Sequence, residues 1–475
     1  MHYDNGGFAL DYATDPYPVH KIGEKSMQYR RYLVLAAFSC AALLSGCSTV
    51  SIRPGQTTDV KLPDSQVVRH QRLVSFSELP GWKDDNIKEV WPAFKRSCNA
   101  NATMPEWQQV CIRAADVDGR DSGSVRDFFE KWFTPYSITT DTGSDTGLAT
   151  GYYEPVLRGS YRKQGGFQTA LYREPRDLLE IDFTGIYPQL KGMRLRGHLE
   201  DIKAGASGDA KGLKRVDDLL MLDLTSAYPK LVGLPLWGKL DGRTVVPYAA
   251  PGTVDYTGLQ AAKKVVPYET RGQLERSGKL KGQEILWVDD VIDAFFLEIQ
   301  GSGRIYLPES KSTVRLAYAN QNGRPYRSIG RYLLDKGELK PGQASAQQIK
   351  QWVRKHPSRL REVLDANPSY VFFREEKLTD PDEGPKGSQG VPLTPGRSIA
   401  VDRKYIPMGT PVFLDTTMPN SKKPLRRLVM AQDTGGAIAG PVRADFFWGW
   451  GNEAGSMAGK MKQKLKVWLL LPKQM

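Results

Sequence analysis

Two segments of the chain, 177–199 and 218–240, repeat each other in register at an offset of 41 positions. Twelve of their 23 positions are identical, and Tyr187 with Tyr228 is one such pair. Composition alone would give roughly one or two matches. The repeat therefore predicts a duplicated strand–turn–strand unit.

A second, looser echo follows, because the letters VVPY occur at 245–248 and again at 265–268. Two copies are too few for a solenoid, in which stacked repeats share a continuous core. A β-barrel domain with an added hairpin, over 176–284, is the simpler architecture. The alternative, a lengthened wall for a substrate groove, rests on little beyond Trp237 and the tyrosines.

The rest of the composition favours the same fold class. The 46 Gly and 31 Pro, with short alternating apolar runs, are typical of β-rich proteins with many turns. Helical spacing over 84–94 and 125–132 predicts helices that pack on a sheet. We therefore expect a mainly β fold with some helices, and 475 residues suffice for two or three domains.

The N-terminal region has the pattern of an export signal. Arg30 and Arg31 precede an apolar stretch, 32–44, that is too short to span a bilayer, and Leu-Ser-Gly-Cys47 closes it. This ending resembles a bacterial lipoprotein signal, which is cut before a cysteine that is then acylated. We expect a lipoprotein signal peptide over 27–46 and a lipid on Cys47. An ordinary cleaved signal or a buried apolar helix is the alternative.

Residues 1–26 do not fit the start of such a signal. We expect translation to begin at Met27, so that 1–26 are an extension foreign to the natural protein. The polar residues 47–65 would tether the fold. Several acyl chains anchor a protein stably, and Ser48 after the cysteine is typical of outer-membrane sorting. We expect a protein lipid-anchored on the periplasmic face of the outer membrane.

Charge and cysteine usage narrow the partners. The 66 Lys and Arg exceed the 53 Asp and Glu by 13, which suits an anionic partner such as cell wall, membrane or nucleic acid. Without an arginine-rich run, zinc spacing or basic helix, nucleic acid is not favoured. No metal-ligand spacing is present, so we expect neither metal nor cofactor. Cys98 and Cys111 remain outside the signal, as a disulfide or as two buried thiols.

The stretch AQDTGGAIAGPVRADFFWGW, 431–450, is the candidate catalytic segment. Asp433 and Asp445 are separated by glycines and followed by aromatic residues, and the apolar run before Asp433 predicts a buried strand. A carboxyl group beside apolar surface has a raised pKa and can donate a proton near neutral pH. On these residues alone, Asp433 is equally well a turn residue and Asp445 a surface acid.

Six motifs, in chain order, carry a resemblance to a known family: GYYEPVL, FLEIQGSGRI, PYRSIGRYLL, NPSYVFF, VPLTPGRSIAVDRKYIPMGTPVFL and AQDTGGAIAGPVRADFFWGWG. From about 150 onward, and more weakly over 75–150, the chain resembles the membrane-bound lytic murein transglycosylase A family. The segment from about 390 to 475 resembles the 3D domain, named for three aspartates that are here Asp402, Asp433 and Asp445.

The resemblance implies a double-psi β-barrel domain and a second, smaller β domain, with a groove between them. Residues 66–175 and 285–475 would build the main barrel domain. Residues 176–284, with the duplicated unit, would build the second domain. Outer-membrane lipoproteins are the rule in this family, in agreement with the expectation for Cys47.

The activity that the resemblance implies is cleavage of the β-1,4 bond between N-acetylmuramic acid and N-acetylglucosamine in peptidoglycan glycan strands, leaving 1,6-anhydro ends. Ordinary glycosidases use two carboxylates. Here the substrate supplies the nucleophile, so one acid can protonate the leaving oxygen and then accept the proton of the C6 hydroxyl. By the motif match Asp445 is that acid, Asp433 orients it or stabilises positive charge on the sugar, and Asp402 is mainly structural.

The remaining site expectations concern the substrate. The expected substrate contacts are Tyr153, Gln300, Ser302, Gly303, Arg327 and Ser328, with Trp448 and Trp450 either in the core or as a platform. Glu298 and Glu154 are the next acids to consider. A cell-wall synthase complex is the protein partner to consider. Two other readings stay open: a peptidoglycan-binding scaffold without catalysis, and a muramidase that uses water.

Overall fold

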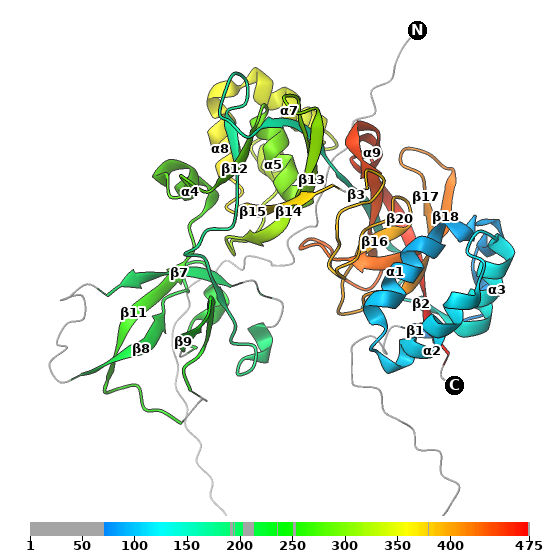
Figure 1. The fold of residues 1–475 in the computed structure, drawn as a ribbon, viewed down its shortest axis with the longest axis horizontal. Helices are drawn as coiled ribbons and strands as arrows, with labels where there is room; N and C mark the ends of the chain where they lie inside the picture. Colours follow the sequence, from blue (N-terminus) through cyan, green and yellow to red (C-terminus); the bar gives the residue numbers. More distant parts are fainter. Residues whose placement is uncertain are drawn as a thin grey trace, which may run out of the picture.

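The computed structural model describes residues 71–190, 193, 195–202, 213–234, 236–249, 253–378 and 380–473. The expected extension, signal peptide, acylated Cys47 and tether lie outside these residues. Within them, no helix has both the length and the apolar character needed to cross a membrane. The described strands form three sheets (Figure 1).

The first sheet has the order β1-β2-β20-β17-β18-β16-β19-β3, and β20 also pairs with β3. This pairing closes the six strands from β20 to β3 into a ring, which we call the first barrel. The strands of the sheet are β1 (Gln71–Leu73), β2 (Phe133–Ile138), β3 (Gly147–Glu154), β16 (Ser398–Val401), β17 (Pro411–Thr417), β18 (Pro424–Asp433), β19 (Arg443–Trp450) and β20 (Lys462–Pro472). Alternate residues of its strands, such as Ala444 and Phe446 of β19, fill one apolar core.

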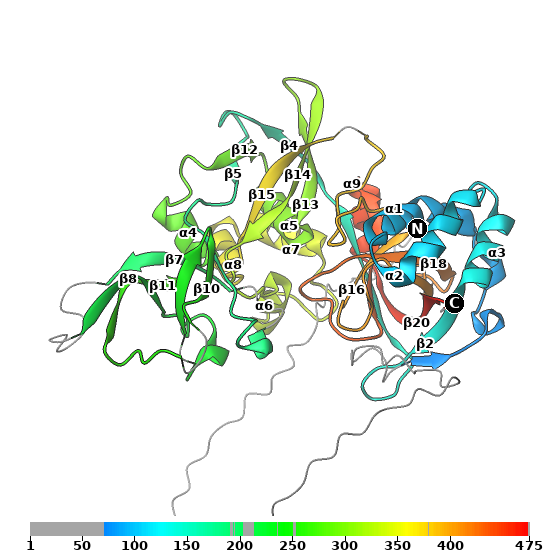
Figure 2. The same cartoon turned by 60° about the horizontal axis from the view of Figure 1, so that its bottom comes forward.

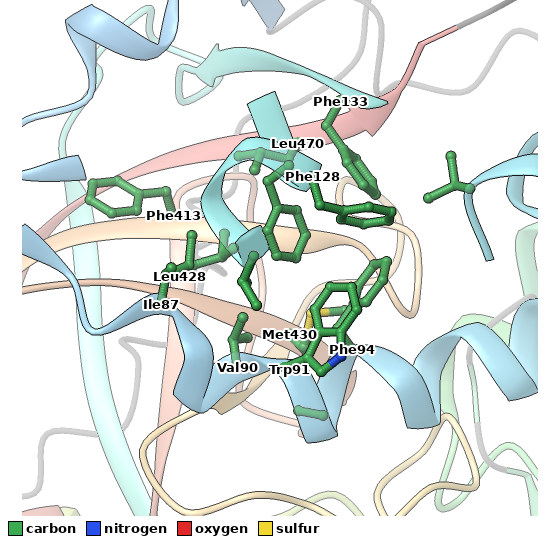
Figure 3. Close-up of a cluster of buried hydrophobic side chains, with 14 of the residues drawn as sticks. Ile87, Val90, Trp91, Phe94, Phe128, Phe133, Phe413, Leu428, Met430 and Leu470 are labelled. Atoms are coloured by element: carbon green, nitrogen blue, oxygen red, sulfur yellow. The ribbon is translucent and has the colours of Figure 1, made fainter. Parts of the chain in front are cut away.

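Three helices cover the outer side of β17, β18 and β20: α1 (Trp91–Asn101), α2 (Pro105–Arg113) and α3 (Ser122–Trp132). Phe94 of α1 and Phe128 of α3 pack together in one cluster with Leu428 and Met430 of β18 (Figure 3). The helix expected over 125–132 is α3. The helix expected over 84–94 is instead two 3₁₀ turns, Trp82–Asp84 and Ile87–Val90, followed by α1. A disulfide joins Cys98 of α1 to Cys111 of α2, with a Cα–Cα distance of 5.4 Å.

The repeated segments form a closed barrel of their own, with the order β10-β6-β7-β11-β8-β9, which we call the duplicated barrel. Its strands are β6 (Leu179–Ile181), β7 (Arg196–Asp201), β8 (Lys214–Leu222), β9 (Trp237–Asp241), β10 (Thr244–Pro247) and β11 (Leu259–Pro267). Leu179 pairs with Gly197 in the first copy, and Leu220 pairs with Gly238 in the second, 41 positions later in each case. The two copies therefore adopt the same strand–turn–strand conformation.

The VVPY echo completes the internal symmetry. Val245 of β10 lies opposite Ile181 of the first copy. Val265 of β11 lies opposite Leu222, which is the counterpart of Ile181 in the second copy. Each echo strand also pairs with the other copy, β10 with β9 and β11 with β7. The two halves thus exchange strands around one apolar core.

The third sheet has the order β15-β14-β13-β4-β12-β5. Its strands are β4 (Val156–Ser160), β5 (Thr169–Tyr172), β12 (Glu284–Val288), β13 (Ser302–Leu307), β14 (Ser312–Gln321) and β15 (Val371–Lys377); with it pack α4 (Arg271–Ser277), α5 (Val291–Gln300), α6 (Ile329–Asp335), α7 (Ala346–Lys355) and α8 (Leu360–Asp365). In Figures 1 and 2 this unit lies between the first barrel and the duplicated barrel.

The fold class, mainly β with some helices, agrees with the expectation. The division of the chain differs from it, because 66–175 and 285–475 do not share one barrel. The chain leaves the first barrel at Pro155, between β3 and β4, and returns to it only at Ser398. Proline has no N–H to continue the ladder, and its carbonyl oxygen accepts from the Arg304 N–H of the third sheet at 2.8 Å.

Candidate active site

The two candidate acids lie on the two strands that flank β16, at the same level of the first barrel. Ala400 of β16 pairs with Asp433 of β18 on one side and with Asp445 of β19 on the other. With strands about 4.8 Å apart, the two Cα atoms are separated by roughly 10 Å. A register shift between Ile399 and Ala400 marks a bulge beside Asp433, and bulges re-aim side chains.

Asp445 points out of the barrel, because its neighbours Ala444 and Phe446 point into the core. Its Oδ1 accepts a hydrogen bond from Thr150 Oγ1 at 2.5 Å. Burial raises the pKa of Asp445, against the opposing effects of the Arg443 charge and the Thr150 hydrogen bond, and the Asp433 charge adds to the rise. A raised pKa favours the proton-carrying form.

Asp433 is held by more donors. Its Oδ1 accepts from Ser388 N, Ser388 Oγ and Thr434 N, each at 2.9 Å, and its Oδ2 accepts from Tyr152 Oη at 3.1 Å. Burial raises the pKa of Asp433 although these hydrogen bonds oppose it. Burial and the two acids hold the pKa of Tyr152 well above its usual value, so this hydroxyl remains a donor.

The carboxyl groups therefore differ in what they leave open. Both Asp433 oxygens have donors. Among the described residues no protein group donates to Asp445 Oδ2, and this atom is not one of the buried side-chain atoms that lack a partner. Asp445 is therefore the acid with an oxygen that no protein donor occupies, and that oxygen is available to a ligand.

Neither alternative acid is available for proton transfer. Glu154 is fully buried and receives Arg304 Nε at 2.8 Å and Arg315 Nε at 2.6 Å. Glu298 is bound by Arg271 through both guanidinium Nη atoms, at 3.0 and 2.7 Å. Both carboxylates are thus occupied by arginines in buried pairs, and breaking such a pair is costly.

A connecting segment, 380–397, passes over Asp433 on its way from the third sheet to the first barrel. Ser388 in this segment holds the acid, and Gln389 N donates to Gln432 O at 3.0 Å. A side chain at Gly387 would come within 2.4 Å of Gln432 O and 3.2 Å of Asp433 Cβ. Only glycine permits this approach.

The expected substrate contacts are divided by the structure. Tyr153, Gln300 and Ser328 line one cavity, together with Gly151, Gly455 and Ala346, and neither acid lines it. Tyr153 N donates to Gln300 Oε1 at 3.1 Å. Because residues alternate along a strand, Tyr153 and the pair Thr150 and Tyr152 extend from opposite sides of β3.

The other three expected contacts lie elsewhere. Ser302 pairs with Ala317 within the third sheet. A Cβ on Gly303 would lie 2.0 Å from Leu297 Cδ1, so this glycine allows close packing. Arg327 is exposed, and its N–H donates to Asn367 Oδ1 at 3.0 Å.

The remaining candidates have packing contacts. Asp402 accepts from Lys404 N at 3.1 Å and from Gly440 N at 2.9 Å, and so joins two loops. Trp448 packs on Phe446 and donates to Met461 Sδ at 3.4 Å. Arg304 lies over the Trp450 ring at 3.9 Å.

Sequence reasoning missed four residues that hold the acids: Thr150, Tyr152, Ser388 and Arg443. Thr150 and Tyr152 could have been found from the sequence, because they occupy alternate positions of the strand that leads into GYYEPVL and so share one face. Ser388 and Arg443 gave no local signal. Across 71–473, as far as described, no group of three or more His, Cys, Asp or Glu is arranged to hold a metal ion.

Comparison with known proteins finds domains of the same family in consecutive parts of the chain. The family described as the MltA specific insert domain matches residues 148–211 and 215–374, and the 3D domain matches 397–471. The membrane-bound lytic murein transglycosylase A of Vibrio cholerae is 36% identical over 221 residues, which are 45% of this chain and 58% of that protein. The chain thus spans little more than half the length of the curated relatives it matches.

Two solved structures cover far more. The lytic transglycosylase LtgG of Burkholderia pseudomallei is 41% identical, with 85% of this chain and 96% of that one covered at a TM-score of 0.51. MltA from Neisseria gonorrhoeae is 36% identical, with 85% and 93% covered at a TM-score of 0.64.

Proposed function

Because the chain belongs to the membrane-bound lytic murein transglycosylase A family, we propose that it cleaves peptidoglycan glycan strands as a lytic transglycosylase. The bond broken is the β-1,4 bond from C1 of N-acetylmuramic acid to O4 of N-acetylglucosamine. The relatives' names support the substrate class. One observation carries the mechanism: Asp445 is buried and protonation is favoured, yet its Oδ2 is open.

In the proposed reaction Asp445 acts twice. Its Oδ2 proton passes to O4 as the C1–O4 bond breaks and positive charge develops at C1. The muramic C6 oxygen then bonds to C1, and the C6 hydroxyl proton returns to Asp445. The enzyme ends in its starting protonation state, and no water is consumed.

Asp433 takes the second role, as a positioned negative charge near the developing positive charge. Its four donors hold the carboxylate in place, and preorganised charge costs no reorganisation during the reaction. Tyr153, Gln300 and Ser328 are proposed sugar contacts because they line the cavity beside β3. Ser302, Gly303 and Arg327 are proposed to shape that region from the third sheet and the loop before α6.

The signal pattern of the sequence and the relatives' description as membrane-bound support a location at the outer membrane, which we propose for this protein. A lipid on Cys47 would hold the protein on the periplasmic face of the outer membrane, where a cell-wall synthase complex is a suitable partner. Metabolic labelling with a radioactive fatty acid tests this: the label should appear on the wild type and be absent from Cys47→Ala.

The activity is tested by incubating the purified protein with peptidoglycan sacculi and identifying the released muropeptides by mass spectrometry. We expect 1,6-anhydro products, which are one water lighter than the reducing products of a muramidase. Release of reducing ends would identify a hydrolase instead. Binding to sacculi without release would identify a scaffold, and either result would overturn the proposal.

A further inference from the structure

The Asp445 carboxyl group is held through a short relay that begins at a buried arginine. Arg443, on the same strand, is 7% exposed. Its guanidinium donates to Ala444 O at 2.7 Å, to Leu148 O at 3.3 Å and to Thr150 Oγ1 at 2.8 Å. Guanidinium groups only donate, so in the last bond Thr150 must be the acceptor.

The next hydrogen bond runs from Thr150 to Asp445. A threonine hydroxyl has one proton and two acceptor lone pairs, and the Arg443 N–H occupies one of these lone pairs. The Thr150 hydroxyl donates its proton to Asp445 Oδ1, 2.5 Å away. Backbone pairing of Thr150 with Asp445, between β3 and β19, keeps the two side chains adjacent.

The consequence concerns the two oxygens of one carboxyl group. Oδ1 accepts the Thr150 proton, so in the acid form the proton of Asp445 must lie on Oδ2. Oδ2 is also the oxygen without a protein donor among the described residues. We propose that Thr150 and Arg443 are positioning residues, which orient the Asp445 carboxyl so that Oδ2 is the oxygen that gives and recovers the transferred proton.

The part of Asp445 in proton transfer rests on the proposed function, but the effect of Thr150 and Arg443 on its carboxyl group does not. The relay donates to the charged form, so removing it should leave the acid harder to ionise. Removal of the Thr150 hydroxyl also removes the group that orients the carboxyl. Loss of a hydrogen bond to a charged group lowers a rate by about ten- to a hundredfold.

The test is a matched pair at one position, Thr150→Val and Thr150→Ser. Valine keeps the shape and β-branching but has no hydroxyl, and serine keeps the hydroxyl. On sacculi we expect kcat/KM to fall about ten- to a hundredfold for valine, with its alkaline limb displaced to higher pH, and to stay within about threefold for serine. Equal loss in both variants would indicate lost packing. An unchanged profile in valine would likewise overturn the proposal.

A second readout does not depend on activity. The carboxyl carbon of Asp445, labelled with ¹³C and identified by difference against Asp445→Asn, is titrated by NMR in folded wild type, Thr150→Val and Thr150→Ser. We expect a higher pKa for Asp445 in valine and a wild-type value in serine. If the wild type is inert and the pKa of Asp445 is nevertheless higher in the valine variant, the transglycosylase function alone is refuted. Active wild type with no displacement in valine refutes the relay alone.

Discussion

The first barrel and the duplicated barrel both close six strands around an apolar core, but they differ in what they bury. Among the described residues of 179–267, no charged side chain is buried, and the buried Tyr228 has its hydroxyl hydrogen-bonded to the Arg196 backbone. The first barrel buries Thr150, Gln432, Arg443 and Asp445. A buried polar group costs free energy unless it is hydrogen-bonded, so these groups come with their partners.

The contrast teaches where chemistry arises. In the duplicated barrel the copies agree in register, and the repeated residues serve turns and close packing, which any two copies can share. In the first barrel the buried polar residues have specific partners from other parts of the chain, as Thr150 bonds Asp445 and Gln432 bonds Ser97. Repetition accounts for the architecture of one barrel, and unrepeated polar pairs account for the site on the other.

The sharpest test of this contrast is Asp445→Asn. The amide can still accept from Thr150 but carries no transferable proton. We expect anhydro-muropeptide release to fall about 10³- to 10⁴-fold, while the far-ultraviolet circular dichroism spectrum and a cooperative thermal transition are retained. Near-normal release would place the proton donor elsewhere, with Asp433 as the first candidate.

The next effect is on stability. Arg271, which begins α4 directly after the duplicated barrel, is buried against Glu298. In Glu298→Gln the Arg271 charge loses its bidentate partner and keeps Glu275 at 3.5 Å. We expect the free energy of unfolding to fall by about 3 kcal/mol, measured in urea. The pH profile of the residual activity should match wild type. A displaced profile would mean that Glu298 takes part in the chemistry.

A smaller effect tests whether the two copies are equivalent. A side chain at Gly197 would lie 2.4 Å from Val266 O, and one at Gly238 would lie 2.7 Å from Val245 Cγ1. We expect Gly197→Ala and Gly238→Ala each to destabilise by about 1–3 kcal/mol, with the backbone contact making Gly197→Ala the worse. At Gly185 nothing lies within 4 Å, so Gly185→Ala is the control, expected within about 0.5 kcal/mol of wild type.

The smallest effect is the pH dependence of stability. The folded pKa of Asp445 is raised, chiefly by burial, above that of the unfolded chain. Its stabilising contribution is then complete below the unfolded pKa and is lost as pH rises through the folded pKa. The Tm of Asp445→Asn relative to wild type should therefore increase from pH 4 to pH 8. A difference that is constant with pH would contradict the raised pKa.

The sequence predicted what is encoded locally. The internal repeat predicted the duplicated unit, because both copies and their offset can be read directly from the sequence. The pair Asp433 and Asp445 was found for the same reason, since glycines and aromatics surround them within one segment. Their ranking needed the family resemblance.

What could not be predicted depends on distant pairing. Thr150 meets Asp445 across 295 positions, and Ser388 meets Asp433 across 45. No local pattern specifies which face of β3 carries an acid's partner, so the sequence did not single out Tyr152, whose hydroxyl donates to Asp433. The division of the expected main domain into two sheets also follows from pairings made far along the chain.

The ring closure of the first barrel has a consequence for the order of folding. Strand β3 finds its partner β19 only 295 positions later, where Thr150 meets Asp445, and its other partner, β20, lies still further along the chain. The buried Arg397 reaches Asp85 across 312 positions. Such distant pairings form late, because a long loop must close before any contact rewards it. The duplicated barrel needs only 179–267. A chain still emerging from its ribosome can therefore complete that barrel before the strands that hold Asp445, the proposed proton carrier, have paired.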